Sequence, residues 1–120
     1  MESISQLFKA LGDQNRLRVV AALLEYDELC ACQLTEFLQI TAATASRHMG
    51  VLVASGLVSS RKESRWVYYR LTQKSRPLLE MLDWLSRQLK NDTTIKQDRK
   101  TLAEITSCDK NDLCKRHNTP

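Results

Sequence analysis

The chain has 120 residues, of which 42% are hydrophobic and 27% charged, with a net charge of +4 at pH 7. That length suits one small domain with one core, and no apolar run approaches the ~20 residues of a bilayer span, so we expect no membrane segment. The N-terminus opens with an acidic residue rather than the positive region of a secretory signal. We therefore expect a cytoplasmic protein with reduced cysteines.

Charge is distributed unevenly along the chain. Residues 25–40 contain four acidic and no basic residues, whereas residues 41–74 contain six basic residues and one acidic residue. Such an asymmetry suggests two ligands of opposite charge. We expect an anion at the basic segment and a cation at the acidic one.

Two amphipathic helices are predicted at the N-terminus. The first carries apolar residues at i, i+3, i+4 and i+7 between Ile4 and Leu11, and Gly12 ends it. The second follows Asp13, a good N-cap residue, and continues to Tyr26.

A short third helix over residues 31–38 and a fourth over residues 42–55 are separated by three residues, which predicts a helix-turn-helix. The outer face of the fourth helix is polar and basic. Arginine is the usual partner of guanine, and hydroxyls can bond phosphates or bases. We assign DNA contacts to Thr41, Thr44, Ser46, Arg47 and His48.

Residues 57–62 and 65–71 are rich in β-branched and aromatic residues and predict a hairpin directly after the fourth helix. Arg61, Lys62 and Arg65 gather at its tip, where they can reach phosphates beside a groove. A helix-turn-helix followed by such a hairpin predicts a mainly α winged helix-turn-helix with a small β-hairpin.

A fifth helix is predicted from Ser75, with Leu78, Leu82, Leu85 and Leu89 spaced by 4, 3 and 4. This apolar seam exceeds what a small domain can cover. Pairing the terminal helices of two copies would bury it, so we expect a homodimer.

Residues 1–90 thus form the predicted DNA-binding and dimerisation domain, and residues 91–120 a polar tail. Ile95, Leu102 and Ile105 allow at best one weak helix in that tail, so we expect it to be largely flexible.

Cys30 and Cys32 lie in the acidic segment, where the third helix begins. Sulfur ligands select soft metals and metalloids. Side chains two residues apart on an α-helix point about 200° apart around its axis. Both sulfurs can therefore reach one ion only where the backbone is extended or unwound. Cys108, Cys114 and His117 match no compact zinc pattern.

With three glycines and no recognisable catalytic constellation, the chain is not expected to be an enzyme or to hold an organic cofactor.

Four segments in order resemble the ArsR/SmtB family of winged-helix metal-responsive repressors. They are LGDQNRLRVVAAL, ELCACQL, TAATASRHMGVLVASGLV and RWVYYRL, and the match covers roughly residues 7–71. ELCACQL is similar to the signature of the arsenic-responsive branch.

The resemblance implies a dimeric repressor that binds an inverted-repeat operator in double-stranded DNA and is released when As(III) or Sb(III) binds Cys30 and Cys32. Cd(II)- and Pb(II)-responsive members share a similar thiolate pair. The arsenic pattern often has a third cysteine where this chain has Thr35. Cys108, Cys114 or an exogenous thiol could supply that ligand instead. A thiol-redox regulator and a protein-binding winged helix are further alternatives.

Overall fold

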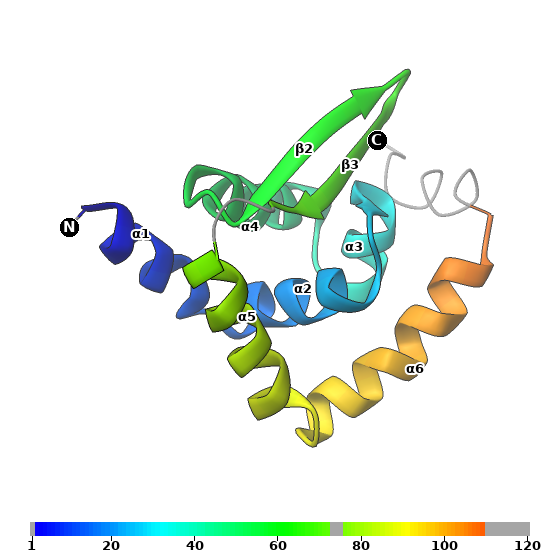
Figure 1. Ribbon diagram of the computed structural model, residues 1–120. Coiled ribbons are helices and arrows are strands. Elements are labelled where there is room, and N and C mark those ends of the chain that lie inside the picture. The colour runs from blue at the N-terminus through cyan, green and yellow to red at the C-terminus, as the bar shows by residue number, and fades with distance from the viewer. Residues whose placement is uncertain (1, 73–75, 110–120) are drawn as a thin grey trace.

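A computed structural model of the chain describes residues 2–72 and 76–109. Its elements in chain order are α1 (Glu2–Leu11), α2 (Gln14–Glu25), β1 (Leu29–Cys30), α3 (Ala31–Leu38), α4 (Ala42–Ala54), β2 (Val58–Glu63), β3 (Trp66–Leu71), α5 (Arg76–Leu89) and α6 (Thr93–Ser107). The β2–β3 hairpin projects from a body of helices (Figure 1). The predicted winged helix-turn-helix fold is confirmed. Within the described residues, no helix is long and apolar enough to cross a membrane.

The helix-turn-helix is formed by α3 and α4, which pack on each other, and α4 also packs on α2, where Val19 and Val20 are fully buried. Leu34 of α3 and Leu52 of α4 are completely buried in this core. α3 ends at Gln39, whose left-handed backbone (φ 55°) turns the chain. Thr41 then caps α4, as predicted, by accepting a hydrogen bond from the Thr44 N–H at 3.1 Å.

The wing is a three-stranded antiparallel sheet in the order β1–β3–β2. The sequence predicted two of these strands; β1 has only two residues, too few to leave an alternating pattern. Glu63 pairs with Trp66, which places the turn at Ser64 and Arg65, one residue later than expected. Ser64 adopts a φ of 56° there.

The expectation of a largely flexible segment after residue 90 needs correction for residues 93–107, which form the 15-residue helix α6. Asp92 caps it by accepting a hydrogen bond from the Ile95 N–H at 3.1 Å. The three apolar side chains noted in the sequence, Ile95, Leu102 and Ile105, are all buried. α6 packs on α2 and α3 and so covers the helix that carries Cys32.

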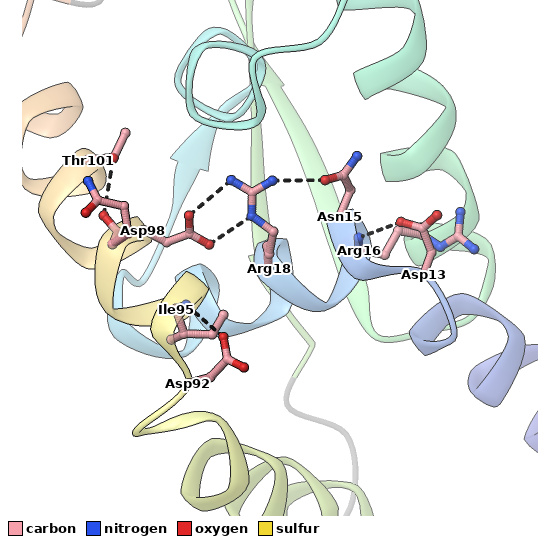
Figure 2. Close-up of polar contacts among 9 residues, drawn as sticks. Asp13, Asn15, Arg16, Arg18, Asp92, Ile95, Asp98 and Thr101 are labelled. Atoms are coloured by element: carbon pink, nitrogen blue, oxygen red, sulfur yellow. Dashed lines mark hydrogen bonds and ion pairs between the residues drawn. The ribbon is translucent and has the colours of Figure 1, made fainter.

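One arginine of α2 joins three helices. The Arg18 guanidinium donates to both carboxylate oxygens of Asp98 on α6, at 2.9 and 3.0 Å, and to Asn15 at 3.0 Å (Figure 2). It also lies over the Phe37 ring of α3, 5.0 Å from the ring centre. Asp98 is buried, and this bidentate pair is what makes its burial tolerable.

Candidate DNA interface and thiol site

The outer face of α4 is built as the sequence predicted for most of its residues. Thr41, Ser46 and Arg47 are exposed, and Thr44 is half-buried. The Thr41 hydroxyl donates to that of Thr44 at 2.9 Å, and the Arg47 guanidinium donates to the Thr44 hydroxyl at 3.3 Å. These side chains form a polar, basic surface at the first turns of the helix.

His48 lies elsewhere. Its side chain is only 15% exposed, and Nδ1 is 3.1 Å from Arg16 Nη1 and 3.9 Å from Asp13 Oδ1. Arg16 Nε in turn donates to the Ala10 carbonyl at 2.7 Å. His48 therefore joins α4 to the α1–α2 junction instead of lying on the outer face. The sequence offered no signal for this, because its partners are more than 30 positions away.

The carboxylate in this junction is electrostatically perturbed. Burial acts to raise the pKa of Asp13, but the hydrogen bond from the Arg16 N–H and the positive charges of His48 and Arg16 outweigh it. The pKa of Asp13 is therefore held below its usual value of 3.8.

The basic side chains of the wing divide into two groups. Lys62 and Arg65 are exposed near the turn, and the Arg65 guanidinium lies 5.3 Å from the centre of the Trp66 ring. Arg61 donates to both carboxylate oxygens of Glu28, at 2.7 and 2.8 Å, and this hydrogen bonding is the largest cause that raises its pKa. Arg61 is thus engaged with the segment before β1.

The two predicted thiol residues lie at the junction of β1 and α3. Cys30 ends β1 and is the N-cap residue of α3, with φ −85° and ψ 160°. It therefore has the extended backbone that the spacing argument required. Cys32 is in the first turn of α3, and the exposed fractions of Cys30 and Cys32 are 1% and 8%. Cys30 is a free thiol, whereas Cys32 is disulfide-bonded.

A cavity of about 170 Å³ lies between Cys32 and α4. Its walls come from α3, α4 and β3 and are mostly apolar. The lining residues are Ala31, Cys32, Leu34, Thr35, Ala42, Ala45, Ser46, Met49, Val67 and Tyr69. Cys32 and four residues of α4 therefore line the same space.

A third protein ligand is not assembled within residues 2–72 and 76–109, where no group of three His, Cys, Asp or Glu side chains could hold a metal. Thr35 donates its hydroxyl to the Ala31 carbonyl at 2.8 Å. Cys108 is exposed as the C-cap residue of α6, and its Sγ donates to the Glu104 carbonyl at 3.4 Å. Cys114 and His117 lie outside the described residues.

Comparison with protein families matches residues 13–60 to the model described as "Bacterial regulatory protein, arsR family". Over 67 residues the chain is 46% identical to the "Arsenical resistance operon repressor" of Escherichia coli K12. Over another 67-residue alignment it is 43% identical to the "Cadmium resistance transcriptional regulatory protein CadC" of Listeria innocua. Each alignment spans 56% of this chain and little more than half of the relative, 57% and 56%.

A longer match is to the "Arsenic resistance transcriptional regulator ArsR1" of Pseudomonas putida KT2440, 33% identical over 104 residues, covering 82% of this chain and 77% of the relative. Among solved structures, HlyU from Vibrio cholerae N16961 is similar with a TM-score of 0.63 and 31% identity. That match covers 72% of this chain and 90% of HlyU.

Proposed function

Because the chain belongs to the arsR family of bacterial regulatory proteins, we propose that it is a transcriptional repressor released from its operator by a soft metal ion or metalloid. The observation that carries the proposal is the position of Cys30. This buried thiol is the N-cap of α3, which packs on the DNA-reading helix α4. The family is one of DNA-binding regulators rather than enzymes.

We assign operator contacts to α4 and to the tip of the wing. Arg47, with Thr44 and Ser46 beside it, reads base edges or phosphates in the major groove. Lys62 and Arg65 bind phosphates of the flanking backbone. A dimer places two such helices about 34 Å apart, which fits an inverted repeat in double-stranded DNA.

Unpartnered apolar side chains support the dimer. Phe8 on α1 is 61% exposed and Trp84 on α5 is 53% exposed, with Ile4 and Leu79 exposed on the same two helices. Large apolar side chains exposed on two helices, here α1 and α5, are typical of a protein interface. A second copy of the chain, related by a two-fold axis, is the occupant we propose.

For the inducer, we propose As(III) or Sb(III) bound to the thiolates of Cys30 and Cys32. Cys32 lines the cavity between α3 and α4, whereas Cys30 is 1% exposed, so an ion that binds both sulfurs must displace β1 or the first turn of α3. Because α3 supports α4, this displacement needs to supply only ~1–3 kcal/mol to weaken DNA binding 5- to 150-fold. Cd(II) or Pb(II) is the alternative inducer, since the relatives include both arsenic and cadmium regulators.

The decisive experiment is an operator-release titration with As(III), Sb(III), Cd(II) and Pb(II). Release is measured by the fluorescence anisotropy of labelled operator DNA. A phosphine reductant is included because Cys32 must be reduced before it can bind the ion. Wild-type protein should release DNA, and the Cys30→Ser/Cys32→Ser variant should not. Cys108→Ser is the matched control and should respond like the wild type. Release of the double variant by arsenite would rule out this site as the sensor.

The disulfide at Cys32 favours one second candidate, a thiol-redox regulator. In that case oxidation of the thiols would release the operator, and arsenite would have no effect. Peroxide added without arsenite to protein that has been reduced and then freed of the phosphine, with the same anisotropy readout, separates the two functions.

A further inference from the structure

Arg61 lies on β2 of the wing, yet its side chain is bonded to the residue just before β1 rather than presented at the tip of the hairpin. It donates two hydrogen bonds to the Glu28 carboxylate, at 2.7 and 2.8 Å. Glu28 lies two residues before Cys30, and its side chain is only 22% exposed. Two parallel hydrogen bonds between a guanidinium and a partly desolvated carboxylate form a strong, directional contact.

The sheet places this contact in line with the thiol. Cys30 of β1 pairs with Tyr68 of β3, and Tyr68 pairs with Arg61 of β2. The three residues therefore occupy one row across the sheet. The Arg61 guanidinium crosses the Tyr68 ring, 4.4 Å from its centre, to reach Glu28. One side chain thereby joins β2 to the residue that precedes β1, although β1 and β2 are not neighbours in the sheet.

A phosphate contact is the other role open to Arg61, and the geometry disfavours it. A guanidinium that bonds a carboxylate through two nitrogens must give up those bonds, or share them, to bind DNA. Lys62 and Arg65 lie nearer the turn, where both are exposed. Sequence alone could not separate these three basic residues, because Glu28 is 33 positions from Arg61.

We propose that Arg61 is a positioning residue, which holds the β2–β3 hairpin against β1 and transmits displacement of Cys30 to the hairpin. The proposal rests on the function proposed above. In the free protein, the Glu28–Arg61 pair and the β1–β3 ladder keep the hairpin in its DNA-binding position. When an ion pulls the Cys30 thiolate out of the row, Glu28 moves with it and the hairpin loses this support.

The test uses Glu28→Gln, which changes no residue on the proposed DNA surface. We expect the ion-free variant to bind operator on the order of fivefold more weakly than wild type, and its response to the inducer to shrink by a similar factor. If Arg61 is instead a phosphate contact, Glu28→Gln frees it, and DNA binding stays equal or becomes tighter. That result would overturn the proposal.

Glu63→Gln is the matched control. It removes the same charge from a carboxylate 3.5 Å from Arg61, but Glu63 belongs to β2 itself and does not connect Arg61 to β1. We expect it to behave like wild type in both measurements. Circular dichroism establishes that each variant is folded.

A double-mutant cycle gives an independent readout if one single variant is unstable. Once Glu28→Gln is present, Arg61→Gln should cause little further loss of ion-free DNA affinity, because the two residues act as one unit. Additive losses would contradict the proposal. Since these measurements need no inducer, they remain valid even if no ion releases the wild type, an outcome that defeats only the proposed function.

Discussion

At the scale of single residues, the partner within reach determines what each arginine can do. Arg61 and Arg18 are each paired through two nitrogens with a carboxylate, Glu28 and Asp98. Arg47 donates to a neutral threonine hydroxyl at 3.3 Å, a weak contact that DNA can replace at small cost. Of these three arginines, Arg47 has the contact that a DNA base or phosphate could most easily replace.

Replacement of Arg47 by alanine should relax sequence preference. Loss of a bidentate base contact removes ~1–3 kcal/mol of discrimination at one position of the site. Lys62→Ala should instead weaken binding to all sequences and lower the slope of log K against log salt by about 1, because it removes one phosphate contact. Anisotropy titrations with operator and scrambled DNA at several salt concentrations measure both effects. Unchanged affinity and footprint in both variants would contradict the assignment.

Asp13 should make stability depend on pH in acid. The pKa of Asp13 is lower in the folded state than its usual value of 3.8. Its contribution to the free energy of unfolding is therefore fully present above pH 3.8 and is lost as the pH falls through the pKa of the folded state. Asp13→Asn keeps the N-cap acceptor but removes the charge. Urea unfolding should show a difference in the free energy of unfolding between wild type and variant. This difference should be constant from neutral pH to about pH 4 and should disappear below that pH. A difference that persists in strong acid would exclude this explanation.

The placement of individual side chains was only partly predictable from sequence. Thr41 as the cap of α4 and Arg47 on its outer face follow from local pattern, because both depend on residues within one turn. His48 and Arg61 do not, because their positions depend on Arg16 and Glu28, more than 30 residues away.

At the scale of elements, periodicity was sufficient wherever an apolar stripe was long. The helices up to α5 and both strands of the hairpin follow from such stripes. β1 has two residues and gains its strand character from pairing with β3, a contact that only the fold creates. α6 was underestimated because Asp98 interrupts its apolar face, and the Arg18 partner that permits this burial is 80 residues away.

The docking of α6 should contribute substantially to stability. Leu102 is 2% exposed, and replacing such a leucine with alanine typically costs ~2–5 kcal/mol. We expect Leu102→Ala to lower the free energy of unfolding by an amount in this range in urea denaturation. Lys96→Ala, on the exposed face of the same helix, is the control and should change stability by less than about 0.5 kcal/mol. Equal stability of both variants would mean that α6 does not dock in solution.

At the scale of the whole molecule, association should decide whether the protein functions. One copy leaves apolar side chains of α1 and α5 exposed, and an inverted repeat needs two recognition helices. The proposed intersubunit surface and the proposed DNA surface belong to different helices, so we expect that association and DNA binding can be altered separately.

Trp84→Glu should therefore yield a folded monomer with weak operator binding, because a charge in an apolar interface is costly to bury. Sedimentation at micromolar concentration measures the change in mass. Val53→Glu, the same kind of change at an exposed apolar residue of α4, should leave the mass of the assembly unaltered. A wild-type chain that sediments as a monomer would contradict the dimer.

The late position of α6 in the chain has a consequence for synthesis. Asp98 is synthesised 80 residues after Arg18, its ion-pair partner. The helix-turn-helix and the wing are thus synthesised in full before α6, the helix that covers α2 and α3. Because Leu102 and Ile105 of α6 belong to the same core, the packing around α3 is complete only when this last described helix has been made.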